Sequence, residues 1–282
     1  MVVFPADPKP ASPGALRVLS LNLAHGRKDA LNQMLLNDED IKRNLNEVSL
    51  MLNKTGADVV ALQEADGPSR WSGGFDHVAL LAGQAGYPWY SRATHAKSWL
   101  FDYGTALMSN IPFSEHINHA FQPTPPSLTK GLTLGQIAWR PYGRKDPVHI
   151  DIVSVHLDFS RDSVRAKQVA EVAGLLSKRG HPLIVVGDFN SDWLSNASVV
   201  VELARRCGMR AYQPMAEDLA TYRSSGRRLD WMLISEELEF LSHEVLPEVV
   251  SDHQAVVADI GLKAAYGSRP LAPQSSASRC TP

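Results

Sequence analysis

The stretch HPLIVVGDFN, residues 181–190, is an apolar run that ends at a glycine and continues at once into an acid and an amide. A short β-branched run between turn-forming residues is typical of a strand that is buried within a sheet. Asp188 and Asn190 therefore stand where a buried strand leaves its sheet. Any role for these two polar side chains has to be found at that end of the strand.

On both sides of this stretch, short apolar runs alternate with helical patterns between residues 16 and 263. The pattern predicts further strands at residues 17–23, 58–64, 104–109, 134–140, 148–158, 227–235 and 255–262. It predicts helices at residues 40–56, 75–86, 163–180 and 196–208. Strands outnumber helices, and the helices fall between them. This order indicates two packed sheets with helices covering their outer faces.

Composition limits the class of protein. The 282 residues are 44% hydrophobic, which is enough for a sizeable core. The net charge of −2 lacks the broad basic excess of proteins that depend on non-specific attraction to phosphate, although it leaves room for a local basic patch. Cys207 and Cys280 are too few for a disulfide framework and have no metal-ligand spacing, so the redox compartment stays open.

The two ends of the chain differ from its body. Prolines dominate residues 1–15, which predicts an extended N-terminal arm, and residues 264–282 are rich in Ser, Pro and Ala, which predicts a mobile C-terminal tail. The body, residues 16–263, is expected to form one domain. No intact secretory signal and no run of roughly 20 apolar residues is visible, so the sequence indicates a soluble chain of unknown localisation and oligomeric state.

Polar side chains recur where the predicted strands end. Taken singly, each is explained by turn chemistry, a helix cap or a solvated charge. Taken together, carboxylates, carboxamides and imidazoles are the groups needed to hold Mg²⁺ and to hydrolyse a phosphate ester. The set comprises Asn22, Glu64, His156, Asp188, Asn190, Asp230, Asp252 and His253.

Seven short motifs in a fixed order carry a family resemblance. They are LSLNLAHG (19–26), VVALQEAD (59–66), DYGTALMSN (102–110), IVSVHLD (152–158), VVGDFN (185–190), RRLDWMLIS (227–235) and VSDHQAV (250–256). In these motifs the chain resembles the endonuclease/exonuclease/phosphatase superfamily of metal-dependent phosphoesterases. The resemblance covers nearly the whole body. It implies an α+β fold, a four-layer α/β/β/α sandwich of two mixed, mainly antiparallel sheets flanked by helices.

The resemblance also implies roles for single residues. Glu64, Asn22 and Asp252 correspond to metal-binding positions, for Mg²⁺ with Mn²⁺ as a substitute. Asn22, Asn190 and Tyr103 correspond to phosphate-binding positions, and a packed aromatic is an equal explanation for Tyr103. The expected catalytic residues are His156, Asp188, Asp230 and His253, in which Asp188 positions or activates water and Asp230 orients the ring of His253.

Three functions stay open at this point. The first is a metal-dependent phosphodiesterase acting on nucleic acid by in-line attack of an activated water. The second is a phosphodiesterase or phosphatase acting on a phospholipid head group or another small phosphate ester. The third is a non-catalytic binding module on the same fold. Candidate rim cations for a nucleic acid are Arg27, Lys28, Arg70 and Arg92, and the number of bound metals is not determined.

Overall fold

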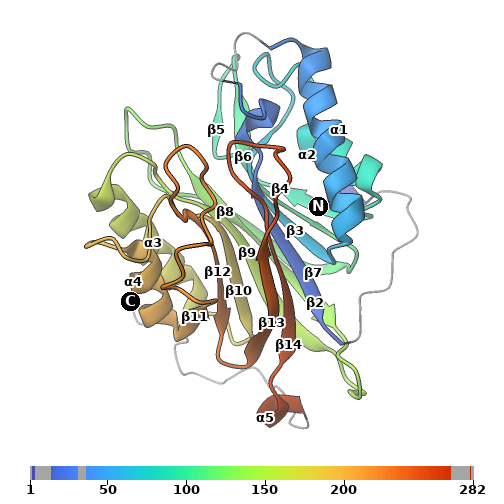
Figure 1. Ribbon diagram of the computed structural model, residues 1–282, viewed down its shortest axis with the longest axis vertical. Coiled ribbons are helices and arrows are strands. Elements are labelled where there is room, and N and C mark those ends of the chain that lie inside the picture. The colour runs from blue at the N-terminus through green and yellow to red at the C-terminus, as the bar shows by residue number, and fades with distance from the viewer. Residues whose placement is uncertain (1, 4–13, 31–35, 268–279, 281–282) are drawn as a thin grey trace.

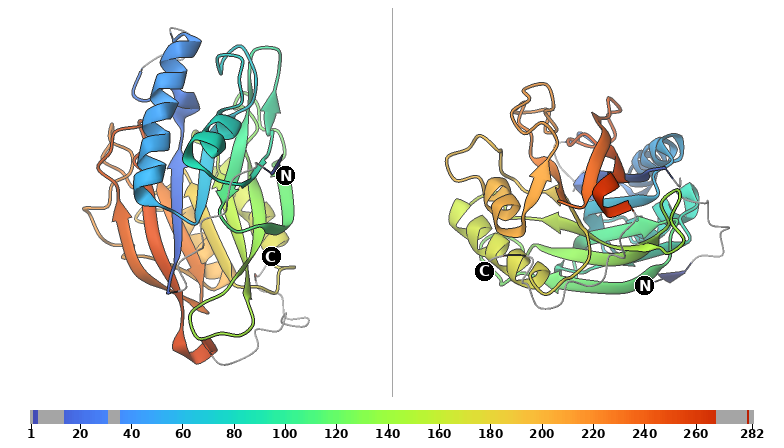
Figure 2. Two further views of the ribbon diagram at one scale, coloured as in Figure 1. Left: turned by 90° about the vertical axis from the view of Figure 1, so that its right-hand side faces the viewer. Right: turned by 90° about the horizontal axis from the view of Figure 1, so that it is seen from below.

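Two β-sheets pack face to face at the centre of the computed structural model, which describes residues 2–3, 14–30, 36–267 and 280 (Figure 1). One sheet has eight strands and the other has six. Helices cover the outer face of each sheet, and Figure 2 shows the two groups of helices on opposite sides of the molecule. The layers confirm the four-layer sandwich expected from the sequence.

The strand order in each sheet is as follows. The eight-stranded sheet runs β1 (Val2–Val3), β4 (Trp89–Arg92), β6 (Asp102–Ser109), β3 (Val59–Asp66), β2 (Leu16–Asn22), β14 (Val256–Leu262) and β13 (Leu238–Val245), with β5 (Ala96–Lys97) also paired to β6. The six-stranded sheet runs β11 (Met209–Ala211), β12 (Asp230–Ser235), β10 (Leu183–Asp188), β9 (Val148–His156), β8 (Gly131–Trp139) and β7 (Phe113–Ala120). The pairs β2–β3 and β9–β10 are parallel, and the other pairs among the described residues are antiparallel.

Two helices pack on each sheet. The eight-stranded sheet is covered by α1 (Asp38–Thr55) and α2 (His77–Ala85), and the six-stranded sheet by α3 (Asp162–Leu176) and α4 (Val199–Cys207). A short 3₁₀ helix, η1 (Ala24–Gly26), follows β2, and α5 (Ala264–Gly267) follows β14.

Local sequence explains why α1 begins and ends where it does. Asn37 caps the helix by accepting a hydrogen bond from the Asp40 backbone N–H, and Gly56 adopts the left-handed conformation that ends it. Between these ends, apolar residues spaced three or four apart form one buried face. That face consists of Ile41, Leu45, Val48 and Leu52.

The central strands are buried on both faces because they separate two cores. In β2, Leu19 and Leu21 pack against α1 and α2, whereas Leu16 and Val18 point toward the six-stranded sheet. Period-two alternation of side chains therefore assigns neighbouring residues of one strand to different cores. This double burial explains the continuous apolar runs that the sequence shows.

Strand direction gathers polar residues at one end of the sandwich. Because β9 and β10 run parallel and in register, His156 and Asp188 lie side by side at their carboxyl ends. The antiparallel strand β12 begins at Asp230, which is the register partner of Asp188. In the other sheet β2 ends at Asn22, beside the end of β3. The polar strand ends found in the sequence therefore converge in space.

Some strands have no clear signal in the sequence. Strands β7 and β13 lie at the outer edges of the two sheets, and much of each is exposed, so their apolar pattern is broken. Strands β1, β4, β5 and β11 are short. Sequence periodicity does not predict these six strands, and each is held in its sheet by pairing with a neighbouring strand.

The chain ends are only partly described. Val2 and Val3 pair with β4, and the rest of the predicted arm up to residue 13 lies outside the described residues. In the predicted tail, α5 forms, and buried Cys280 is joined to Cys207 by a disulfide that the sequence did not predict. Residues 268–279 and 281–282 lie outside the described residues. Within the described part of the chain, no helix is long and apolar enough to span a membrane.

Candidate active site

A cavity of about 370 Å³ lies at the end of the sandwich where β2, β3, β9 and β10 terminate. Seven of the residues singled out in the sequence line it: Asn22, Glu64, His156, Asp188, Asn190, Asp252 and His253. The walls also include Arg27, Lys130, Phe159, Tyr222 and Arg227. These seven residues thus line one cavity, although they come from both sheets and from the loops between strands.

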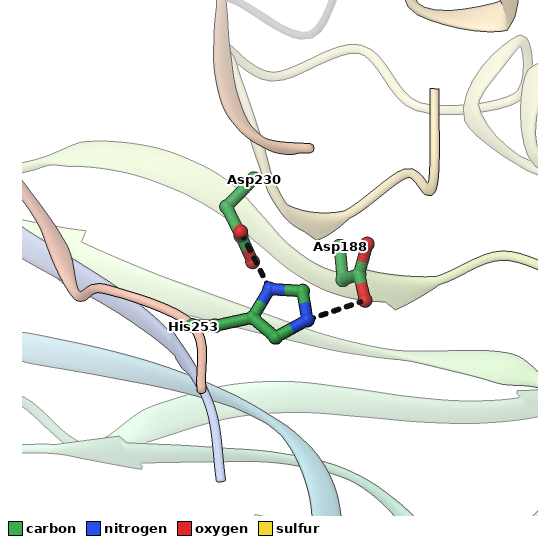
Figure 3. A group of neighbouring side chains, drawn as sticks. All are labelled: Asp188, Asp230 and His253. Carbon is green, nitrogen blue, oxygen red and sulfur yellow. Dashed lines mark hydrogen bonds and ion pairs between the residues drawn. The ribbon is translucent and has the colours of Figure 1, made fainter. Parts of the chain in front are cut away.

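Asp230 and His253 form a buried pair beside this cavity (Figure 3). Nδ1 of His253 donates to Oδ2 of Asp230 at 2.8 Å, so the carboxylate fixes the orientation of the ring. Nε2 then points toward Oδ2 of Asp188, 3.8 Å away. Burial alone would lower the pKa of His253, but the carboxylates of Asp230 and Asp188 raise it to about 10.

Asp188 is held by donors on several sides. Asn22 Nδ2 donates to its Oδ2 at 3.0 Å, and the backbone N–H of Asn190 donates to its Oδ1 at 2.8 Å. His156 Nε2 lies 3.5 Å from the same Oδ2. Burial raises the pKa of Asp188 above its ordinary value, and the nearby His253 only partly opposes this. The result is a carboxylate of fixed position and increased basicity.

The glycine before Asp188 is required by close packing. Gly187 has φ of +141°, and a Cβ atom there would lie 2.0 Å from the carbonyl oxygen of Val155 on the parallel strand β9. A side chain cannot be accommodated without moving the backbone. This explains why the apolar run of residues 183–186 stops at a glycine before the acid.

Glu64 reaches the cavity through an irregularity in β3. The pairing of β3 with β6 shifts between Gln63 and Ala65, and Glu64 at this bulge has φ of +49°. Such strain in a non-glycine residue persists only where the surroundings enforce it, and bulges commonly re-aim a side chain next to an active site. Burial alone would raise the pKa of Glu64, but the nearby His25 and Lys130 cations hold it well below its ordinary range. Glu64 is therefore an ionised carboxylate inside the site.

Lys130 is a site residue that sequence reasoning missed. It is 6% exposed, and its Nζ lies 3.8 Å from Glu64 Oε1 and 3.5 Å from His156 Nδ1. Because an ammonium only donates, Nδ1 of His156 must accept, and Nε2 carries the ring proton toward Asp188. Lys130 has little signal in the sequence, because the predicted strand begins at residue 134, whereas the observed strand β8 begins at Gly131, directly after Lys130.

The remaining predicted residues are placed as follows. Arg27 lies in the cavity wall and donates a hydrogen bond to Asp252. Lys28 pairs with Glu47, and Arg92 pairs with Asp102, so both cations are engaged by neighbouring acids. The hydroxyl of Tyr103 donates to the carbonyl oxygen of Thr129 at 3.3 Å, and Lys130 Nζ lies 5.1 Å from the centre of its ring. A phosphate contact by Tyr103 stays a prediction.

The donor set is suited to a metal ion. Asp188, Asp230 and His253 each offer a ligand atom, and these atoms all lie within 4.8 Å of one another. Oδ1 of Asp230 is buried and has no hydrogen-bond partner within the described residues. Clustered carboxylate oxygens with a free coordination position fit a hard divalent cation, which prefers oxygen ligands.

The two-sheet sandwich with this acidic and imidazole-lined cavity defines a phosphoesterase. The chain belongs to the endonuclease/exonuclease/phosphatase family, whose model matches residues 19–253. No curated protein matches the chain in sequence.

Solved structures support the same fold. An endonuclease/exonuclease/phosphatase from Beutenbergia cavernae is 18% identical to this chain, with a TM-score of 0.70. The match covers 89% of this chain and 72% of that protein. The human Nocturnin catalytic domain with a bound sulfate anion is 19% identical, with a TM-score of 0.66, and the match covers 88% of this chain and 95% of that domain. A mannosyl-6-phosphatase from Bacteroides thetaiotaomicron is 13% identical, with a TM-score of 0.62, and the match covers 87% of this chain and 99% of that protein. At these identities the likeness concerns the fold alone.

Proposed function

We propose that this chain is a divalent-metal-dependent phosphodiesterase that hydrolyses nucleic acid by in-line attack of an activated water. One observation carries the proposal: the His253–Asp230 pair, Asp188 and Glu64 converge on a single cavity although they come from distant parts of the chain. Family membership supports phosphoester chemistry at that cavity.

Besides the cluster of Asp188, Asp230 and His253, the cavity lining offers a second set of oxygen donors, to which we assign the cation that this chemistry requires. Glu64, Asn22 and Asp252 would hold Mg²⁺, and Mn²⁺ would substitute for it. When bound, the cation supplies positive charge that stabilises the phosphoryl oxygens, a contribution of several kcal/mol. The donor set is rich in oxygen and contains no thiol, which suits these ions.

Protein side chains account for the remaining steps. Asp188, fixed by Asn22 and Asn190, accepts the proton of the attacking water, and the new bond forms between that water oxygen and phosphorus. His253, oriented by Asp230, donates to a non-bridging phosphoryl oxygen. Neutral His156 donates a hydrogen bond from its Nε2–H to the leaving oxygen as the phosphorus–oxygen bond breaks, and that oxygen takes its proton from solvent. The proton transfer from water to Asp188 contributes typically about 10²–10⁴ in rate.

Features of the cavity wall support nucleic acid as the substrate. Arg227 supplies a cationic group that suits a phosphate backbone, whereas Arg27 is paired with Asp252. Phe159 is 65% exposed, and with Tyr222 it offers an aromatic surface on which a base could stack. These side chains stand in the same wall as the predicted catalytic groups.

A small phosphate ester or a phospholipid head group is the second candidate. The observation that favours it is the cavity volume of about 370 Å³, which lies in the range of small-molecule sites rather than of extended grooves. The same catalytic residues would serve either substrate, because both present a phosphoryl centre.

Hydrolysis of bis-p-nitrophenyl phosphate tests the chemistry. We expect release of nitrophenol with Mg²⁺ or Mn²⁺, and its loss on chelation. Glu64→Ala and His253→Ala should lose most activity while remaining folded, and they control for a contaminating nuclease. Full turnover by either variant would contradict the assigned roles, and inactivity of the wild type in every metal would favour a binding module.

A substrate panel then separates the two candidates. The panel comprises single- and double-stranded DNA, RNA, sphingomyelin and phosphoinositides, each assayed with the wild type and with His253→Ala. We expect metal-dependent cleavage of a nucleic acid. Cleavage of lipid alone would reject the nuclease proposal and leave the phosphoesterase chemistry intact.

A further inference from the structure

His25 bridges two carboxylates on the inner side of the cavity wall. Its Nε2 lies 3.2 Å from Glu64 Oε2, and its Nδ1 lies 2.9 Å from Asp66 Oδ1. Glu64 and Asp66 belong to the same strand, β3, whereas His25 comes from η1, which follows β2. One imidazole therefore connects the end of β2 to the strand that carries a proposed metal ligand.

The backbone around His25 is held in an uncommon conformation. Ala24, His25 and Gly26 all have positive φ, at +46°, +55° and +73°. Glu64, at the other end of the contact, has φ of +49°. Strain of this kind in non-glycine residues is concentrated at functional sites, where packing enforces it. Here two strained segments present side chains to each other.

Surrounding rings prevent His25 from turning away. Its ring stacks on Trp71, with centroids 4.9 Å apart and planes at 23°, and Tyr103 meets it edge-on at 5.4 Å. Asp66, which holds Nδ1, is 1% exposed. The imidazole is thus fixed by two aromatic contacts and a buried carboxylate, and its Nε2 stays directed at Glu64.

This arrangement treats the two oxygens of Glu64 differently. Oε2 is engaged by His25, whereas Oε1 faces Lys130 at 3.8 Å and His156 at 4.0 Å, both of which line the cavity. A glutamate side chain with one oxygen anchored loses most of its freedom to rotate. Only Oε1 is then presented to the interior of the site.

We propose that His25 is a positioning residue that anchors Oε2 of Glu64, so that Oε1 alone is offered to the catalytic cation. This inference rests on the proposed function, in which Glu64 holds that cation. Removing a residue that orients a metal ligand typically lowers metal affinity by roughly 10- to 100-fold. His25 belongs to this class because it contacts the ligand and not the reacting atoms.

Binding of Mn²⁺ to the substrate-free protein, measured by electron paramagnetic resonance at one fixed pH, tests the inference. We expect His25→Ala to weaken binding by about 10- to 100-fold. His25→Gln keeps an amide donor in reach of Glu64 and should bind with intermediate affinity. His119→Ala is the matched control, because it removes a histidine that pairs with Glu171 at 3.0 Å away from the cavity lining, and it should bind like the wild type.

Turnover at varied Mg²⁺ gives a second readout that a purely structural role would not move. For His25→Ala the half-saturating Mg²⁺ concentration should rise by the same factor, while kcat at saturating Mg²⁺ returns close to the wild-type value. A loss of kcat that no Mg²⁺ concentration restores would overturn the positioning role. Circular dichroism and thermal melting check the fold, and Asp66→Asn serves in place of His25→Ala if the latter does not fold.

Glu64→Ala separates failure of this inference from failure of the proposed function. If Glu64→Ala loses Mn²⁺ but both His25 variants bind it like the wild type, the positioning role is wrong and the metal assignment stands. If Glu64→Ala binds Mn²⁺ as tightly as the wild type, Glu64 is not a ligand, and both proposals are rejected.

Discussion

Nδ1 of His253 and Oδ2 of Asp230 meet at 2.8 Å, although 23 positions separate the two residues in the chain. Asp230 is the first residue of β12 and His253 lies in the loop before β14, so strands from different sheets deliver the pair. Both side chains are buried, which keeps water from competing for the hydrogen bond. The pair is the most tightly specified part of the candidate site.

Asp230→Asn removes the charge of this pair while preserving its shape. An amide stabilises a cationic imidazole less well than a carboxylate does, so we expect kcat to fall by about 10²–10⁴. Steady-state kinetics on bis-p-nitrophenyl phosphate measures the change. Asp192→Asn is the matched control, because Asp192 accepts a hydrogen bond from the backbone N–H of Leu194 in a turn outside the cavity lining. Near-normal kcat in Asp230→Asn would contradict the proposed orientation of His253.

Lys130→Met should lower kcat by about 10²–10³, the usual effect of removing one preorganised charged donor from an active site. The substitution removes a buried cation that faces Glu64 and His156. Lys130→Arg should recover part of the activity, because it restores the charge but not the compact shape. The control is Lys97→Met, which removes an exposed lysine paired with Asp102. Equal kcat for Lys130→Met and the control would exclude Lys130 from the chemistry.

Gly187→Ala should destabilise the fold by more than about 3 kcal/mol, because a Cβ atom clashes with the Val155 carbonyl at a backbone angle that alanine avoids. Gly83→Ala is the matched comparison, because Gly83 lies in α2 with no atom within 4 Å of an added Cβ. That variant should be more stable by up to about 1 kcal/mol. Urea denaturation measures both changes, and equal stability of the two variants would show that β9 and β10 are not so closely packed.

His95 makes stability depend on pH away from the predicted catalytic groups. Its Nε2 lies 2.9 Å from Oγ1 of Thr105, and burial, followed by the nearby Lys130 and His119 cations, lowers the pKa of His95 from 6.5 to about 3. Between these pH values the unfolded chain binds a proton that the folded chain excludes. The free energy of unfolding therefore falls as pH drops below about 6.5, and the loss from this group is complete near pH 3.

His95→Gln should remove this contribution. Between about pH 7.5 and about pH 4.5, the free energy of unfolding of the wild type should fall by about 3 kcal/mol more than that of the variant. Urea denaturation at the two pH values gives the difference. His116→Gln, which replaces an exposed histidine on β7, is the matched control. An unchanged slope in His95→Gln would show that this ring is not buried in its neutral form.

The sequence by itself determined the layered fold and most of the candidate site. Central strands are buried on two faces and leave continuous apolar runs, and long helices leave one apolar stripe, so both are visible without coordinates. Glu64 and Asp188 were found because each follows such a run, and His253 because it lies just before one. The edge strands β7 and β13 were not found, because one exposed side removes the pattern.

Only the tertiary structure decided how the polar residues pair. The sequence left Lys130 as an unremarkable charge and gave His25 no role beyond a supporting contact near the site. It did not connect Cys207 with Cys280. Each of these contacts joins segments that are distant in the chain or depends on a left-handed backbone angle, as at His25 and Glu64. A local sequence pattern indicates which face of a helix or strand is buried. Which side chains then contact each other depends on the strand order and on how the two sheets pack. No short stretch of sequence contains that information.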